Sequence, residues 1–157
     1  MSNEDSNQVL YKILIERLEQ LRTMDKEGDS DRRRHIARET NELHAPLAHR
    51  LGLYAIKTEM EDLALKFLDY KTYKYIAHAL NEKKAQRDAY IHSFITPLEA
   101  KLKAAGFEFT IKGRPKSIHS IYHKMQVQRC DVDRIYDLFA IRIILDSPYE
   151  REKSDCW

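Results

Sequence analysis

Apolar residues recur at helical spacing through the first two-thirds of the chain. Residues 8–24 place three leucines on one helical face: Leu14, Leu18 and Leu21. An acidic stretch with a central glycine, residues 25–31, interrupts this pattern, and residues 31–44 then read as a second helix. This pattern predicts a chain that begins as packed helices.

The helical period continues beyond Pro46, which is expected to begin or kink the next helix. A short turn is expected at Leu51-Gly52-Leu53. One apolar stripe follows between Ile56 and Leu68, made of Met60, Leu63, Ala64 and Phe67. Residues 70–95 continue in the same style, so helix is predicted throughout.

A further helix is predicted to begin at Thr96-Pro97-Leu98-Glu99. Thr96 can cap it, Pro97 suits the first helical position, and Glu99 suits the reciprocal position of a capping box. Gly106 is expected to end this helix.

The period changes after Gly106. Residues 107–111 alternate apolar and polar side chains and predict a strand, and residues 117–125 read as a helix. Residues 138–145, LFAIRIIL, are a run of β-formers that predicts a strand buried on both faces. The predicted class is therefore mostly α over the first two-thirds and α+β after it. The sheet is too small to be complete, and we expect the chain to be a piece of a longer protein.

Composition adds few constraints. The chain has 157 residues, 43% of them hydrophobic and 33% charged, which is typical of a soluble, helix-rich protein. A net charge of +2 is too small to indicate nucleic-acid binding by itself. Cys130 and Cys156 show no metal-site spacing, no apolar run approaches the roughly 20 residues of a membrane span, and MSNEDSNQ is no signal peptide. We expect a reduced, cytoplasmic protein without a membrane segment.

Basic charge is concentrated in FTIKGRPKSIHSIYHKM, residues 109–125, which contains no acidic residue. In a helix starting at Ser117, Ser120 and Lys124 lie four residues apart on one face. Arg114 and Lys116 stand just before that start, where free N–H groups and the helix dipole favour an anion. Two interpretations stay open: a solvated basic edge, or a site for polyphosphate.

Two residues near the last predicted strand are further candidates. Asp137 precedes the strand, where a carboxylate can hold Mg²⁺ together with substrate phosphates or can simply occupy a turn. Arg142 lies inside the strand, so it either faces a ligand or is paired.

Two runs, GRPKSIHSIYHKM and YDLFAIRIILDS, resemble the start of the synthetase domain of the long RelA/SpoT-type (p)ppGpp synthetase/hydrolases. Upstream, RRRHIARETNELHAPLAHRLGLYAIKTEMEDLALKFL resembles the end of their helical hydrolase domain and the linker. The resemblance implies a degenerate HD hydrolase-like region with linker helices at residues 1–80. It implies a truncated synthetase domain at residues 81–157, with an incomplete mixed sheet of nucleotidyltransferase-like type.

The resemblance also implies site residues. The family synthetase transfers diphosphate from ATP to the 3′-hydroxyl of GTP or GDP with Mg²⁺, in the stringent response. Arg114 and Arg142 would stack on adenine, and Asp137 would be the catalytic, Mg²⁺-binding carboxylate. The ATP phosphates would be held by Lys116, Ser120 and Lys124.

Other family segments have no match in this sequence. The EIQIRT-like strand with a second catalytic glutamate and the NGYQSLH-like guanine-nucleotide segment are missing, so we expect the isolated chain to be inactive. LIERLEQLRT stands where family hydrolases have LADRLHNMRT, and Glu16 takes the place of the metal aspartate. The resemblance is to hydrolase-dead members, with no Mn²⁺ site expected.

Three functions remain to be separated. The first is a fragment of a diphosphotransferase, with ATP and GTP or GDP as ligands of the parent protein. The second is a non-catalytic regulatory or binding module between domains. The third is a nucleic-acid binder, suggested by DRRRHIAR but opposed by nearby acidic residues. An open sheet edge suggests a homodimer; ribosome contact by the parent cannot be read from this chain.

Overall fold

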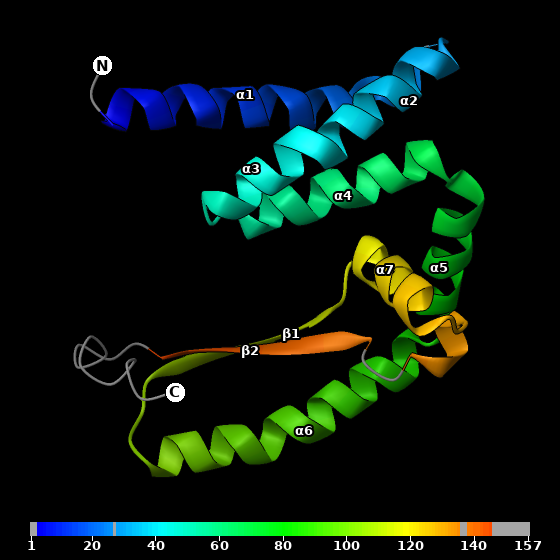
Figure 1. The fold of residues 1–157 in the computed structure, drawn as a ribbon. Helices are drawn as coiled ribbons and strands as arrows, with labels where there is room; N and C mark the ends of the chain where they lie inside the picture. Colours follow the sequence, from blue (N-terminus) through cyan, green and yellow to red (C-terminus); the bar gives the residue numbers. More distant parts are fainter. Residues whose placement is uncertain (1–2, 27, 136–137, 146–157) are drawn as a thin grey trace. The chain divides into compact units, whose positions relative to one another are not determined.

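The computed structural model describes residues 3–26, 28–135 and 138–145 (Figure 1). Contacts divide these residues into two compact units. The helical unit comprises the described residues up to His78 together with Ser117–Ile135. The sheet unit comprises Ala79–Lys116 and residues 138–145. The predicted division at residue 80 stays a prediction, and the contacts group the helix after Ser117 with the N-terminal helices.

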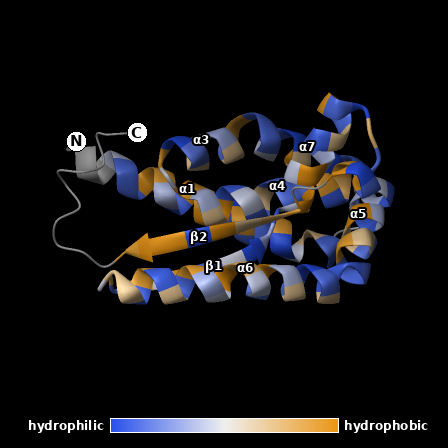
Figure 2. Cartoon of the chain, turned by 90° about the horizontal axis from the view of Figure 1, so that it is seen from below, coloured by the Kyte–Doolittle hydropathy of each residue, from blue (hydrophilic) through white to orange (hydrophobic). Residues whose placement is uncertain are grey.

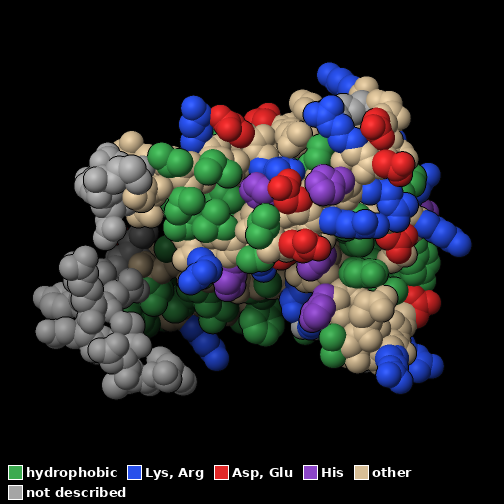
Figure 3. Space-filling view, turned by 45° about the horizontal axis from the view of Figure 1, so that its top comes forward, with side chains coloured by type: hydrophobic (Ala, Val, Ile, Leu, Met, Phe, Trp, Pro, Cys, Tyr) green, Lys and Arg blue, Asp and Glu red, His purple; other side chains and the backbone are tan. Residues whose placement is uncertain are grey.

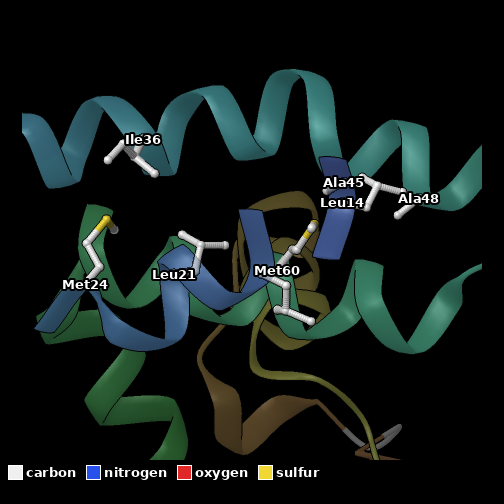
Figure 4. Close-up of a cluster of buried hydrophobic side chains, with 8 residues drawn as sticks. Leu14, Leu21, Met24, Ile36, Ala45, Ala48 and Met60 are labelled. Atoms are coloured by element: carbon white, nitrogen blue, oxygen red, sulfur yellow. The ribbon is translucent and has the colours of Figure 1, made fainter. Parts of the chain in front are cut away.

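The helical unit contains α1 (Asn3–Thr23), α2 (Ser30–Glu39), α3 (Ala45–Arg50), α4 (Tyr54–Leu68), most of α5 (Tyr70–Glu82) and α7 (Ile118–Gln128). Short 3₁₀ turns occupy Met24–Lys26 and Val132–Arg134. The predicted leucine face of α1 is confirmed, since Leu14, Leu18 and Leu21 are all buried. These leucines and Met24 meet α2, α3 and α4 at Ile36, Ala45, Ala48 and Met60 (Figure 4).

The turns of the helical unit follow the predicted breakers. Asp29 caps α2 by accepting from the N–H groups of Asp31 and Arg32. A π-helical turn at Thr40–His44 precedes α3, with the Ala45 N–H donating to the Thr40 carbonyl. Pro46, which has no N–H to donate, then lies in the first turn of α3. The turn after α3 has Gly52 at φ +73, a conformation that favours glycine.

The sheet unit contains α6 (Lys84–Ala104) and an antiparallel pair of strands, β1 (Phe109–Pro115) and β2 (Phe139–Leu145). The register pairs Phe109 with Leu145 and Pro115 with Phe139. Tyr90 of α6 packs against Phe139 of β2, with ring centroids 5.2 Å apart. The predicted change from α to α+β is therefore confirmed.

Residues 70–95 are helical as predicted, in α5 and α6 with a turn at Lys83 between them. Two other predictions for this region are wrong in detail. No helix begins at Thr96, because α6 runs through Pro97 and the Thr96 hydroxyl donates to the His92 carbonyl at 2.9 Å. The missing N–H of Pro97 costs this long helix one backbone bond without ending it.

The second correction concerns β2. Figure 2 shows its almost continuous hydrophobic sequence, yet Ile143 and Ile144 are 41% and 43% exposed. A strand gains two covered faces only when other elements lie on both sides. Among the described residues β2 pairs with β1 alone, so the prediction of a strand buried on both faces is wrong for this structure.

Candidate functional site

The first turn of α7 lies at the centre of the predicted phosphate site. Ser117 caps the helix, and its hydroxyl accepts from the Ser120 N–H at 3.2 Å while donating to the Ser120 hydroxyl at 2.7 Å. This arrangement fixes Ser120 on the first turn, as the Ser-x-x-Ser spacing favours. The predicted start of this helix at Ser117 is therefore confirmed.

The remaining N–H groups of that turn have a partner that the sequence did not suggest. Asp62 of α4 accepts from the His119 N–H at 2.8 Å and from the Ile118 N–H at 3.4 Å. A carboxylate here gains from the helix dipole as a phosphate would. The expectation of free N–H groups at this end of α7 is therefore wrong, because an anion of the chain itself already contacts them.

A second carboxylate of α4 strengthens the contact. Glu61 lies 3.3 Å from Nδ1 of His119 and 3.4 Å from the Lys57 ammonium. Burial by itself would raise the pKa of Glu61, but the hydrogen bond from His119 and the nearby Lys57 ammonium hold that pKa below its usual value. Burial raises the pKa of Asp62, and the N–H groups of His119 and Ile118 only partly oppose it.

The predicted phosphate-binding side chains of α7 share one helical face. Ser120 and Lys124 are four residues apart on α7, and both are half-buried. Lys124 also takes part in an interaction. Any phosphate held here would therefore be bound by side chains rather than by the backbone at the start of α7.

In the sheet unit, the two predicted adenine-stacking arginines share a face. Arg142 of β2 lies opposite Lys112 of β1, and Arg114 is two residues from Lys112. Directly opposed residues of an antiparallel pair, and alternate residues of one strand, project to the same side. Lys112, Arg114 and Arg142 therefore form a basic face of the two-stranded ribbon.

The other predicted residues are placed as follows. Arg114 and Arg142 are both exposed. Arg142, which the sequence left as either paired or facing a ligand, is therefore open to a ligand. Lys116 directly follows β1 and donates its backbone N–H to the Leu138 carbonyl at 2.9 Å. Asp137, the predicted catalytic and Mg²⁺ residue, lies outside the described residues, as does Cys156.

The hydrolase position has ordinary helix-surface contacts. Glu16 is exposed and lies 3.8 Å from Lys12 in an i,i+4 pair. One turn further along α1, Arg22 binds Glu59 of α4 through two nitrogens, at 2.6 and 2.8 Å. In the described ranges no three His, Cys, Asp or Glu side chains gather as a metal site would require. The face in Figure 3 likewise mixes acidic, basic and histidine side chains.

Sequence reasoning missed Asp62 and Glu61. The available signal was the acidic pair inside KTEMEDLALKF, on a helix whose apolar stripe was recognised. Two adjacent acidic residues beside a buried apolar stripe are normally interpreted as solvent-exposed. Their partner His119 lies 57 residues beyond Asp62 in the sequence. Only the folded chain brings them together.

Two family models match parts of the chain. Residues 3–54 match the model of the HD domain, and residues 113–157 match the region found in RelA/SpoT proteins. No described helix is long and apolar enough to cross a membrane.

Named relatives match most of the chain. A probable guanosine-3′,5′-bis(diphosphate) 3′-pyrophosphohydrolase of Synechocystis is 38% identical over 95% of this chain and 19% of its own length. A GTP pyrophosphokinase of Escherichia coli K12 is 39% identical over 85% of this chain and 18% of its own length. A GTP pyrophosphokinase of Streptomyces coelicolor is 41% identical over 88% of this chain and 16% of its own length. The chain thus spans about a fifth of the length of these relatives.

Proposed function

The chain belongs to the RelA/SpoT proteins, and from this premise we propose that it forms the ATP-binding part of a diphosphotransferase. In the parent reaction, the 3′-hydroxyl oxygen of GTP or GDP attacks the β-phosphorus of ATP. The bond from that phosphorus to the α–β bridging oxygen breaks, AMP leaves, and the hydroxyl proton passes to a base. The names of the relatives include both pyrophosphokinase and pyrophosphohydrolase. We propose the synthetic direction because the runs at residues 113–125 and 136–147 resemble the start of the family's synthetase domain.

The basic face of the β1–β2 ribbon is the observation that carries the proposal. The ribbon places Arg114 and Arg142 on one side, where planar guanidinium groups can stack on a purine. By resemblance to the family alone, Lys116, Ser120 and Lys124 would bind the phosphates, because phosphoryl transfer depends on positioning and on neutralising charge. Asp137 would hold Mg²⁺, a role that rests on the resemblance alone.

A second function has its own support. Asp62 and Glu61 attach α7 to α4, so the helix carrying Ser120 and Lys124 is packed into the helical unit. This contact favours the alternative of a regulatory module, in which α4 sets the position of α7. The two functions are compatible, because one helix can bind phosphate and transmit position.

Calorimetric titration of the 157-residue chain with Mg²⁺ and a non-hydrolysable ATP analogue tests the proposal. We expect binding that weakens at least tenfold in Arg142→Ala and in Lys124→Ala. Lys103→Ala, an exposed lysine in the last turn of α6, is the matched control and should bind normally. Equal affinity in all four proteins would overturn the ATP site and leave the regulatory module.

Three further assignments belong to this proposal. With ATP and GTP, we expect the isolated chain to make no (p)ppGpp, because segments that the family uses for GTP are not in it. We place the parent in the cytoplasm. We also propose a homodimer formed through an open sheet edge, which light scattering after size-exclusion chromatography would detect.

A further inference from the structure

A pocket of about 510 Å³ lies in the helical unit, and none of its lining residues is among those assigned to ATP. Its walls are the first half of α2, the 3₁₀ turn after α1, and the junction between α4 and α5 (Figure 1). Arg33 and Arg34 line it from α2, and Lys66, Phe67 and Tyr70 line it from the α4–α5 junction. This volume is within the range of about 300–1,000 Å³ typical of small-molecule sites.

The pocket has an excess of positive charge. Three cations line it: Arg33, Arg34 and Lys66. Lys66 is paired with Asp25 at 2.5 Å, so the charge of Lys66 is already balanced. The Arg33 Nε is buried and has no hydrogen-bond partner, and the guanidinium of Arg34 has none within the described ranges. A buried N–H of a charged group without an acceptor is costly. A ligand that supplies oxygen acceptors would remove that cost.

Two aromatic rings complete the pocket. The Lys66 ammonium lies 5.6 Å from the centre of the Phe67 ring, and Tyr70 is 56% exposed although it stands at the first position of α5. An exposed tyrosine beside unpaired arginines offers a flat apolar surface next to positive charge. Planar ligand rings stack on such surfaces, while guanidinium forks bind phosphate oxygens in pairs.

We propose that this pocket binds a small ligand that joins a phosphate group to a flat ring, as a nucleoside phosphate does. Arg33 and Arg34 bind the phosphate, and Tyr70 stacks on the ring. The proposal is independent of the ATP site, because the two sets share no residue. It also gives a role to DRRRHIAR, which the proposed function does not use.

The same residues argue against a nucleic-acid strand as the occupant. Asp29 and Asp31 flank the arginines, and Asp25 lies within the pocket. A nucleic-acid strand needs basic charge along its whole track, whereas this charge is gathered in one pocket. One or two phosphates fit the charge that is present.

A fluorescent guanosine diphosphate, with the fluorophore on its ribose, tests the proposal on the 157-residue chain. We expect binding that is at least tenfold weaker in Arg33→Gln/Arg34→Gln and about threefold weaker in Tyr70→Leu, the two losses reporting phosphate and ring separately. Arg38→Gln, an exposed arginine on the same helix outside the pocket, is the matched control and should bind normally. Circular dichroism establishes that each variant is folded.

The experiment separates a failure of this proposal from a failure of the proposed ATP site. Lys124→Ala should leave this affinity unchanged, and ligand addition should slow hydrogen exchange in α2 and at the α4–α5 junction. Binding lost in Lys124→Ala but kept in the double arginine variant would overturn the proposal, since the probe would then occupy the ATP site. Displacement by inorganic pyrophosphate as effective as by guanosine diphosphate would overturn the role of Tyr70. Tighter competition by single-stranded RNA would overturn the small-ligand assignment.

Discussion

The helical unit and the sheet unit differ in where their hydrophobic residues end up. In the described ranges every buried apolar side chain belongs to the helical unit, from Leu14 in α1 to Ile135 after α7. Both units leave some large apolar side chains exposed, but the described part of the sheet unit buries none to offset its exposed Tyr90, Phe94, Phe107, Ile143 and Ile144. A hydrophobic sequence therefore predicts the need for burial, and the number of packed layers decides whether burial occurs.

This contrast predicts a large difference in sensitivity to truncation. Met60→Ala in the helical core should cost about 2–5 kcal/mol of unfolding free energy, because Met60 has no exposed surface. Ile144→Ala should cost about 0.5 kcal/mol or less, because Ile144 is 43% exposed. Urea unfolding followed by circular dichroism measures both. Similar losses would show that β2 is covered as well as the helical core.

The close approach of α6 to β1 gives the second test. A Cβ added at Gly113 of β1 would lie 2.4 Å from Cγ2 of Ile91, on a stiff β-branched side chain of α6. Gly113→Ala should therefore cost about 1–3 kcal/mol and speed hydrogen exchange in β1 and β2.

Gly28→Ala is the control for that substitution, since nothing lies within 4 Å of an added Cβ there and its φ is not positive. It should be neutral or slightly stabilising. Unchanged exchange in β1 for Gly113→Ala would mean that α6 does not constrain the ribbon.

The third test concerns an ion pair of the helical unit. Arg17, whose side chain is 14% exposed, binds Glu39, and this hydrogen bond lowers the pKa of Glu39. Glu39→Gln should cost about 1 kcal/mol at pH 7, because water screens the more exposed carboxylate.

The pH dependence of that difference has a definite sign. A lowered folded-state pKa contributes stability above the unfolded value of about 4.5, and this stability is lost as pH falls through the folded pKa. The gap between wild type and Glu39→Gln should therefore close on acidification. Glu42→Gln, an exposed neighbour, should show no gap, and a gap that persists at low pH would contradict the assignment.

Local sequence patterns predicted much of the fold. Leucine spacing identified the buried face of α1, and Ser117 marked the start of α7. The same rules failed at Thr96-Pro97, which resembles a helix start but lies inside α6. Capping signals describe what a residue can do locally, and a long helix can outweigh the loss of one backbone bond.

The candidate site was less predictable for a physical reason. Arg114 and Arg142 were identified as candidates separately, but their common face follows from the register of β1 with β2. The pocket beside Arg33 depends on how α2 packs on α4, which no local pattern encodes. Asp137 lies outside the described residues, so its role remains a prediction.

The bond from Asp62 to the start of α7 has a consequence for synthesis of the chain. The acceptor and the Ile118 donor are 56 residues apart, with α4 preceding α7. During translation from the N-terminus, α4 can fold on α1 and α2 before α7 exists, since domains and their parts fold as they emerge. The Asp62 carboxylate is then already in place on folded α4 when Ile118 and His119 leave the ribosome. The Ile118 N–H at the start of α7 can therefore bond, as soon as the helix forms, to a residue synthesised 56 positions earlier.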